Sequence, residues 1–164
     1  MRRMVILCVA VALVLAGCGG SGKKSVAEQE LQRQADSYAI DQIEKTWHKA
    51  SSTQDVDLMM SIWAPDATFG VGPDTLTGKA QIRDFFAHTA GSFKPGNHWV
   101  SDTPAYKIRI TVNGDKGTLY FECHYVDVKT SKVVSVVAAD QNVKKIDGKW
   151  LITSGASASP KLSQ

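Results

Sequence analysis

The order in which two kinds of sequence pattern follow one another constrains the fold of this chain most strongly. Over residues 26–89, apolar side chains recur at roughly helical spacing. Residues 98–153 are instead rich in β-branched and aromatic side chains and are divided by short turns. Helices that precede a run of strands, without alternation of the two, are typical of an α+β fold. We therefore expect one α+β domain with a mostly antiparallel sheet.

Three helices are expected in the first half of the chain. The longest spans residues 26–50, where apolar positions lie about one helical turn apart. Asp55 can cap a second, short helix that carries Trp63. Pro65 should stop this helix, because proline cannot continue it. The third helix is expected over residues 79–89, after a glycine that breaks the chain.

Long strands are expected in the second half. They cover residues 98–112, 118–128, 133–146 and 149–153, and a shorter strand covers residues 68–71. Pro104 marks a bend or bulge in the first long strand, because proline cannot donate a ladder hydrogen bond. Asp147-Gly148 is a strong signal for a two-residue hairpin turn.

The N-terminus has the pattern of an export signal. Arg2 and Arg3 precede an uncharged run over residues 4–17, which is shorter than the roughly 20 apolar residues of a membrane-spanning helix. The run ends at Leu15-Ala16-Gly17-Cys18, which resembles the lipobox of bacterial lipoproteins. This resemblance implies cleavage before Cys18 and lipid attachment to it. The protein would then be held at a membrane of the cell envelope, on the exported side.

Four regions follow from these patterns. They are a signal peptide at residues 1–17, a flexible tether at 18–25, the α+β domain at 26–156 and a small, polar, loose tail at 157–164. The chain has 19 basic and 16 acidic residues, a balance too even to favour nucleic-acid binding. Cys8 would leave with the signal and Cys18 would carry lipid, so Cys123 has no partner for a disulfide within the mature chain.

Several segments resemble a known superfamily. They are Trp47-His48-Lys49-Ala50, Trp63-Ala64-Pro65-Asp66-Ala67-Thr68-Phe69, Ile82-Arg83-Asp84-Phe85-Phe86 and Asp147-Gly148-Lys149-Trp150. Together they make the region from about residue 36 to residue 154 look like the SnoaL-like branch of the nuclear transport factor 2-like superfamily. The resemblance implies a cone-shaped, cystatin-like fold, in which a strongly curved antiparallel sheet packs on three N-terminal helices. The mouth of such a cone often opens into an apolar pocket.

The same resemblance leaves the function open, because one fold supports many activities. Members of the superfamily include isomerases, dehydratases, polyketide cyclases, epoxide hydrolases and non-catalytic binding or assembly modules, and many form dimers through the sheet. Many relatives also place a histidine and a serine soon after the tryptophan of the last strand. Here the sequence Thr153-Ser154-Gly155-Ala156-Ser157 contains no histidine, so a pocket that depends on that histidine would be incomplete.

Alternation along the predicted strands brings a few ionisable side chains onto shared faces. Glu122 and His124 lie two residues apart and are candidates for a proton-transfer pair. Asp140 is the alternative acid or base if the other face lines the cavity. By resemblance to binding relatives, we expect Glu122, His124 and Gln141 on the concave face. In an enzyme, Tyr120 or Gln141 would orient a substrate oxygen.

Aromatic side chains are expected to converge inside the cone, where most would form core and a few would line a pocket. The ligand-binding candidates are Trp47, Trp63, Phe86, Trp99, Tyr106, Tyr120 and Gln141. The sequence has no histidine pair at the spacing of a zinc site and no phosphate-binding glycine loop. Neither a metal nor a cofactor is therefore expected.

Three functions follow from these observations. The favoured one is a membrane-tethered lipoprotein whose domain binds a small, largely apolar ligand or a protein partner, without catalysis. The first alternative is an acid–base enzyme of the isomerase, dehydratase or hydrolase type that uses Glu122 with His124, or Asp140. The second is a dimerising module of the envelope whose sheet face is the interface. The expected partners are the membrane, through Cys18, a small apolar ligand and a second copy of the chain.

Overall fold

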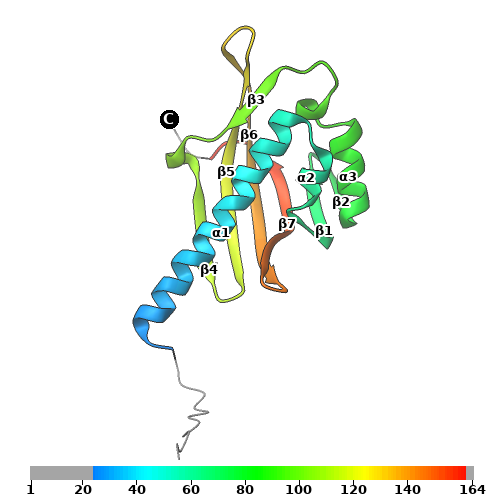
Figure 1. The fold of residues 1–164 in the computed structure, drawn as a ribbon. Helices are drawn as coiled ribbons and strands as arrows, with labels where there is room; N and C mark the ends of the chain where they lie inside the picture. Colours follow the sequence, from blue (N-terminus) through cyan, green and yellow to red (C-terminus); the bar gives the residue numbers. More distant parts are fainter. Residues whose placement is uncertain (1–23, 162–164) are drawn as a thin grey trace, which may run out of the picture.

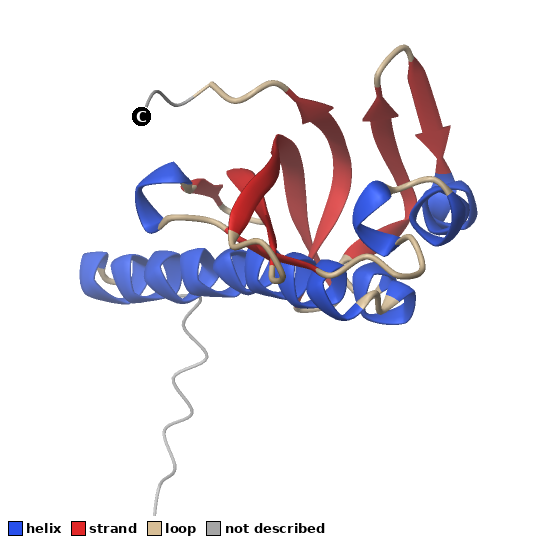
Figure 2. Cartoon of the chain, turned by 90° about the horizontal axis from the view of Figure 1, so that it is seen from above, coloured by secondary structure: helices blue, strands red, loops and turns tan. Residues whose placement is uncertain are grey.

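The computed structural model of the chain describes residues 24–161. The expected signal peptide, Cys18 and most of the expected tether lie outside the described residues, as do residues 162–164. The described part has the predicted α+β architecture: the long helix α1 (Val26–Thr53) lies across one face of a curved, seven-stranded sheet (Figure 1). Figure 2 shows this arrangement from above. We call the face that α1 covers the inner face, and the opposite one the outer face.

The sheet is mostly antiparallel. Its strands are β1 (Trp63–Val71), β2 (Asp74–Thr77), β3 (Trp99–Asp102), β4 (Arg109–Asn113), β5 (Lys116–Asp127), β6 (Lys132–Ile146) and β7 (Lys149–Ala158). They follow the order β2-β1-β7-β6-β5-β3, and β4 also pairs with β5. All pairs are antiparallel except β1 with β7, which run parallel. The long strands β5, β6 and β7 form the centre of the sheet.

Two helices begin where the sequence provides capping side chains. At the start of α1, Ser25 and Glu28 form a capping box, in which each side chain accepts a hydrogen bond from the other residue's amide. As predicted, Asp55 caps the short helix α2 (Val56–Met60), because its carboxylate accepts a hydrogen bond from the Leu58 amide at 2.8 Å. The other helical elements are α3 (Gly78–His88) and the 3-10 turns η1 (Gly91–Phe93) and η2 (Ala105–Lys107).

The second helix is shorter than the sequence predicts, and Trp63 and Pro65 belong to β1 instead. α2 ends at Met60, and Trp63 pairs with Ile152 of β7. The register between β1 and β7 shifts between Trp63 and Thr68, so Pro65 lies where the regular ladder is interrupted. A proline costs little at such a place, because no ladder hydrogen bond is lost. The apolar run that resembles a helix is therefore the buried start of a strand.

The C-terminal strand is longer than the sequence predicts. β7 continues to Ala158, which lies opposite Ala138 of β6, so Ser157 does not begin a loose tail. The small and polar residues of this segment have little strand propensity of their own. The long strand β6 nevertheless supplies backbone partners for them. β2 has no counterpart among the predicted strands, because Leu76 is its one large apolar residue.

Pro104 marks a bend, as predicted. β3 pairs with residues 124–127 of β5, β4 pairs with residues 116–120, and η2 lies between these two strands in the chain. The expected long strand over residues 98–112 is therefore two strands that share one edge of β5. The break allows Lys107 of η2 to turn its side chain toward the middle of β5.

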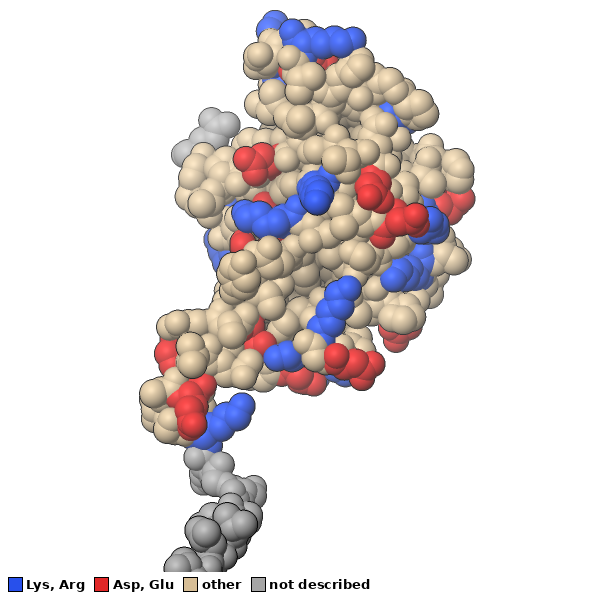
Figure 3. Space-filling model, in the orientation of Figure 1, with Lys and Arg blue, Asp and Glu red and all other residues tan. Residues whose placement is uncertain are grey.

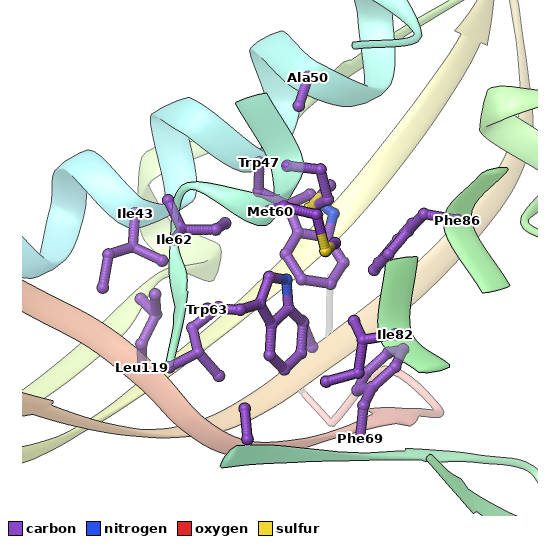
Figure 4. Packing of buried hydrophobic residues seen from close by; sticks show 14 of the residues in the cluster. Ile43, Trp47, Ala50, Met60, Ile62, Trp63, Phe69, Ile82, Phe86 and Leu119 are labelled. Carbon is purple, nitrogen blue, oxygen red and sulfur yellow. The ribbon is translucent and has the colours of Figure 1, made fainter. Parts of the chain in front are cut away.

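The core lies between α1 and the inner face of the sheet (Figure 4). Ile40, Ile43 and Trp47 of α1 belong to one buried cluster with Leu119 and Phe121 of β5. The rings of Trp47 and Phe121 meet nearly edge to face, with centroids 5.6 Å apart. Full burial of a large apolar side chain contributes roughly 1.5–3 kcal/mol, so these contacts fix α1 on the sheet.

Candidate ligand-binding cavity

The register of β5 and β6 decides which side chains share a face of the sheet. The core-facing residues of β5 are Leu119, Phe121, Cys123 and Tyr125. Glu122 and His124 alternate with them and therefore point to the outer face. Gln141 lies directly opposite Leu119 and belongs to the inner face. The expectation that Glu122, His124 and Gln141 share one face is wrong, because alternation within single strands leaves the register between strands undetermined.

A cavity of about 280 Å³ lies between α1, α3, η1 and the inner side of the sheet. Its aromatic lining residues are Trp47, Phe69, Phe85, Phe86, Trp99 and Tyr125. They come from two helices and three strands, so segments far apart in the sequence meet around one space. An engineered cavity of about 150 Å³ in another protein holds benzene. The volume here is therefore sufficient for a molecule of one or two rings.

Contacts between rings hold the wall of the cavity in place. Trp47 meets Phe86 edge to face, with centroids 5.5 Å apart and planes at 87°. Phe86 also contacts Phe93 of η1 at 5.4 Å, and Trp99 contacts Tyr125 at 5.9 Å. Such pairs contribute roughly 0.5–1.5 kcal/mol beyond the area that they bury. The wall is therefore a packed structure that exists before any ligand enters.

The described residues that line the cavity carry no charge at neutral pH. Its polar side chains are hydroxyls, those of Tyr125, Ser92, Ser135 and Ser157. Burial, and then the neighbouring Cys123, raises the pKa of the Tyr125 hydroxyl. Burial likewise raises the pKa of the Cys123 thiol, which lies beside Tyr125, to about 12. Both groups therefore stay protonated, and a ligand in the cavity meets a neutral surface.

The aromatic residues predicted to bind a ligand separate into different places. Trp47, Phe86 and Trp99 line the cavity, whereas Trp63 is buried in the core and is absent from the lining. Tyr106 of η2 is 70% exposed. Tyr120 lies on the outer face of the sheet and Gln141 on the inner face, and neither lines the cavity. Three of the predicted residues therefore meet at one site.

Gln141 is buried on the inner face outside the cavity lining. The amide oxygen and nitrogen of its side chain are both buried without a hydrogen-bond partner. Its Cγ packs so closely on Gly155 of β7 that a Cβ atom there would lie 3.1 Å away. The side chain therefore fills space between β6 and β7, and a glycine opposite it leaves the room it needs.

The predicted acid–base residues gather on the outer face, around a buried ion pair. Glu122 is fully buried, and Lys107 Nζ lies 2.7 Å from its carboxylate. The Tyr120 hydroxyl donates to the same carboxylate at 3.0 Å, and His124 Nε2 lies 3.8 Å from it. The structure thus brings Glu122, His124 and Tyr120 together. The sheet, however, separates them from the aromatic cavity.

Asp140 also lies on the outer face, opposite Tyr120 in the register. Its carboxylate forms an ion pair with the ammonium of Lys161, and the Lys161 amide donates to the Tyr120 hydroxyl at 2.7 Å. The C-terminal segment therefore crosses the outer face of β5 and β6 as far as residue 161. This contact corrects the prediction of a loose tail for the described part of that segment.

Glu44 and His48 form a second buried pair, which the sequence patterns did not single out. Glu44 Oε1 lies 3.0 Å from His48 Nε2, and Lys45 Nζ lies 3.0 Å from the other carboxylate oxygen. Burial alone would raise the pKa of Glu44, but the contacts with His48 and Lys45 lower it overall. A glutamate and a histidine four residues apart on a buried helix stripe were the available signal.

Hydroxyl groups complete the surroundings of His48. Its Nδ1 lies 2.5 Å from Ser101 Oγ, and its Nε2 lies 2.7 Å from Thr103 Oγ1. The Thr103 hydroxyl donates to the Glu122 carbonyl at 2.7 Å, so it accepts from His48 Nε2. His48 therefore carries a proton on Nε2, toward Glu44 and Thr103. This network fastens α1 to β3 and the segment after it.

A larger groove of about 440 Å³ lies between α1, α2 and the turn that joins β6 to β7. Its lining includes Tyr38, Leu58 and Trp150 together with polar side chains such as Gln42 and Lys149. Rings do not surround this groove as they do the cavity, so we take the cavity as the candidate site.

Among residues 24–161, no three or more histidine, cysteine, aspartate or glutamate side chains gather so that they could hold a metal ion. The helices in the same range include none that is both long and apolar enough to cross a membrane.

The fold and cavity define an α+β cone with an aromatic interior, and sequence comparison gives its family. Residues 32–155, most of the chain, match the SnoaL-like domain family. The chain therefore belongs to the SnoaL-like branch of the nuclear transport factor 2-like superfamily, as its segments suggested. No curated protein sequence matches the chain significantly.

Solved structures show the same fold. An NTF2-like protein with a cystatin-like fold from Novosphingobium aromaticivorans has a TM-score of 0.71, with 16% identity, covering 87% of this chain and 94% of that chain. A cystatin-like protein of unknown function from Nostoc punctiforme has a TM-score of 0.64 and 20% identity, over 78% and 94% of the chains. Hexachlorocyclohexane dehydrochlorinase LinA-type3 from Novosphingobium barchaimii has a TM-score of 0.62 and 20% identity, over 79% and 89%. Identities this low establish the fold alone.

Proposed function

We propose that this chain is a membrane-tethered lipoprotein whose cavity binds a small, neutral, largely apolar molecule without catalysing its conversion. The family and fold indicate a ligand-binding or enzymatic function. One observation carries the choice of binding: the described lining of the cavity consists of rings, small residues and neutral hydroxyls. Acid–base catalysis would need a group there that gains or loses a proton near neutral pH.

Solvation free energies support the chemical class of the ligand. Each square ångström of apolar surface that leaves water contributes about 25 cal/mol, so a flat ring between Trp47, Phe86 and Trp99 would gain from burial. A charged group would lose its hydration without meeting an opposite charge among the lining residues. The structurally similar dehydrochlorinase is named for hexachlorocyclohexane, which is itself a neutral apolar ring.

Binding can be tested with naphthalene, a neutral two-ring probe that is fluorescent. Val137 of β6 lines the cavity, whereas its neighbour Val136 points to the outer face. We expect naphthalene to bind, Val137→Trp to weaken binding about tenfold or more by filling the cavity, and Val136→Trp to leave it unchanged. Absence of binding to the unaltered protein, or equal effects of the two variants, would contradict the proposal.

The tether is proposed from the residues Leu15-Ala16-Gly17-Cys18 alone. Acyl chains on Cys18 would hold the domain at the surface of a membrane on the exported side. We expect the protein to incorporate labelled palmitate and to sediment with membranes. Cys18→Ser should abolish both properties, while Cys8→Ser should leave them intact, because Cys8 lies within the signal. Membrane association that survives Cys18→Ser would overturn this part of the proposal.

The Glu44–His48 pair favours one second candidate, an acid–base enzyme. A buried carboxylate that polarises an imidazole is an arrangement suited to proton transfer. The negative charge of Glu44 also helps to raise the pKa of the Cys123 thiol, which lies beside the cavity residue Tyr125. An enzyme built on Glu122, His124 or Asp140 would instead need a separate site on the outer face. A product formed from a bound ligand, and lost in Glu44→Gln with ligand binding retained, would establish the second candidate.

A further inference from the structure

The first part of α1 leaves apolar side chains in contact with water. The buried residues of α1 begin at Asp36, so residues 26–35 lie outside the core. Figure 1 shows this part, in blue, projecting beyond the sheet. Val26 is 83% exposed and Leu31 is 68% exposed. The segment therefore has an apolar surface that the described fold does not use.

Leu31 belongs to a longer row of residues along α1. Leu31, Ala35, Tyr38 and Gln42 follow one another at steps of four, three and four residues, so they share one side of the helix. All four are exposed, Tyr38 to 68%, and hollows in the surface lie beside Leu31 and beside Tyr38. We call these four residues the exposed stripe. Neighbouring apolar residues at a surface, unlike single ones, are typical of an interaction site.

Lysines extend the exposed stripe at both ends. Lys24 lies seven residues before Leu31, and Lys45 and Lys49 lie seven and eleven residues after Tyr38, so all three are on the same side of the helix. The three lysines are exposed. An apolar centre flanked by cations matches the interface of an anionic membrane, where apolar side chains enter the headgroup region and ammonium groups meet phosphates.

The acidic side chain next to the exposed stripe is Glu28, three residues before Leu31. Its carboxylate accepts hydrogen bonds from the amide and the hydroxyl of Ser25 at 2.7 and 2.9 Å. These contacts hold it at the first turn of the helix, where the helix dipole favours a negative charge. The exposed stripe itself contains no carboxylate.

The helix begins close to the proposed lipid anchor. Cys18 precedes Ser25, the cap of α1, by seven residues, and seven residues span at most about 25 Å. Leu31 lies only about 9 Å further along the helix axis. The tether would therefore keep the exposed stripe within reach of the membrane at all times, so that docking costs little additional loss of freedom.

We infer that the exposed stripe of α1 docks on an anionic lipid surface, with Leu31 and Tyr38 in the headgroup region and the three lysines at lipid phosphates. This inference rests on the proposed lipid tether, because the tether supplies the membrane. The sheet packs on the other side of α1, as Figure 2 shows, so the rest of the domain would face away from the bilayer.

A dye on either side of α1 tests which side meets lipid. Leu31→Cys and Gln29→Cys place a thiol at positions about 200° apart around the helix. Both positions are exposed, and Gln29 borders a hollow beside Val112 and Gly114 instead of the exposed stripe. Cys123 is buried and would not react with the dye.

Each variant is made as the full-length lipoprotein, labelled with the fluorophore NBD and reconstituted into vesicles. The vesicles contain phosphatidylethanolamine, phosphatidylglycerol and a nitroxide-bearing lipid that quenches the dye on contact. We expect quenching at position 31 to be about threefold or more stronger than at position 29, and Tyr38→Cys to behave like Leu31→Cys. Phosphatidylcholine in place of phosphatidylglycerol should weaken the quenching at positions 31 and 38 about twofold, because the lysines lose their anionic partners.

The outcomes separate the inference from the proposed tether. If the protein carries palmitate and sediments with the vesicles, but positions 29 and 31 are quenched equally, the inference fails while the tether stands. Quenching that does not depend on phosphatidylglycerol would also overturn the inference. Absence of palmitate from the unaltered protein would overturn the tether and the inference together.

Discussion

At the residue scale, Glu122 shows how a buried charge is tolerated in this fold. The carboxylate is fully buried, and both Lys107 and the Tyr120 hydroxyl contact it. Lys107 is itself 3% exposed. Removing one member of such a pair takes the opposite charge away from the other, whereas replacing both with apolar residues of similar volume is often nearly neutral. We therefore expect the single and double variants of this pair to differ in their free energy of unfolding.

Lys107→Met should lower the free energy of unfolding by about 3–5 kcal/mol, because Glu122 would keep its charge without the ammonium. The double variant Lys107→Met, Glu122→Leu should recover most of that loss. Urea unfolding measures both, and Lys129→Met in the exposed turn after β5 serves as the control. A loss below about 1 kcal/mol for the single variant would contradict the account.

The lowered pKa of Glu44 predicts that the free energy of unfolding depends on pH. Its pKa in the folded state lies below its ordinary value, because His48 and Lys45 contact the carboxylate, so its ionised form stabilises the fold. That contribution is complete above the unfolded pKa and is lost as pH falls from about 4.5 through the lower folded value. Glu44→Gln should therefore flatten the fall in unfolding free energy between pH 5 and the acid range, as urea titrations at several pH values would show. Asp66→Asn, at an exposed position, should leave the slope unchanged, and an identical effect of both variants would refute the assignment.

At the scale of elements, the approach of β4 to β5 depends on Gly117. A Cβ atom at this position would lie 2.4 Å from the Thr111 carbonyl oxygen and 3.2 Å from Ile40 Cδ1. Gly117 thus lets strand β4 and helix α1 lie close to the same point of β5.

Gly117→Ala should therefore cost about 1–3 kcal/mol of unfolding free energy, since the backbone itself must move. Thermal or urea unfolding would report the loss. Gly91→Ala is the comparison, because a Cβ there would meet nothing nearer than Trp99 at 3.7 Å. Equal stability of the two variants would show that β4 is not held as tightly as described.

Sequence patterns predict the elements well where a local signal exists. The helix over residues 26–50, the cap at Asp55 and the bend at Pro104 each depend on neighbouring residues, and the structure confirms them. The start of β1 at Trp63 and the end of β7 at Ala158 depend on partner strands. Alternation within a single strand also cannot fix the register between strands, which is why the prediction that Glu122 and His124 share a face with Gln141 is wrong.

Only part of the cavity lining could be predicted from local sequence patterns. Trp47, Phe86 and Trp99 are large aromatic residues at core-like positions, so they could be predicted as lining residues. Tyr125 could not, because its face of β5 is decided only by the packing of α1. The four-residue spacing of Glu44 and His48 is a local signal, but the hydroxyl partners of His48, Ser101 and Thr103, could not be predicted because they lie more than fifty residues away in the sequence.

At the scale of the whole molecule, both signs of charge are interspersed on the face seen in Figure 3. The outer face of the sheet carries exposed apolar side chains, among them Val136 at 37% and Val100 at 44%. These residues agree with the expectation of a homodimer through the sheet, which stays a prediction.

If the dimer forms through the outer face, Val136→Asp should convert it to monomer, because a buried carboxylate without a partner is costly there. Sedimentation over a wide concentration range would measure the change. Leu31→Asp, at a position of α1 that is 68% exposed, should leave the dimer intact. A monomeric unaltered protein at all concentrations would contradict the prediction.

The proposed function depends most on the binding of a neutral apolar ligand in the aromatic cavity. The four tryptophans of the chain allow a direct test, because Trp47 and Trp99 line the cavity, Trp63 is buried in the core and Trp150 lines the groove between α1 and α2. The measurement is an NMR titration with naphthalene that follows the four indole N–H signals. We predict saturable shifts at Trp47 and Trp99 and none at Trp150. Shifts at Trp150 alone, or at no tryptophan, would contradict the claim.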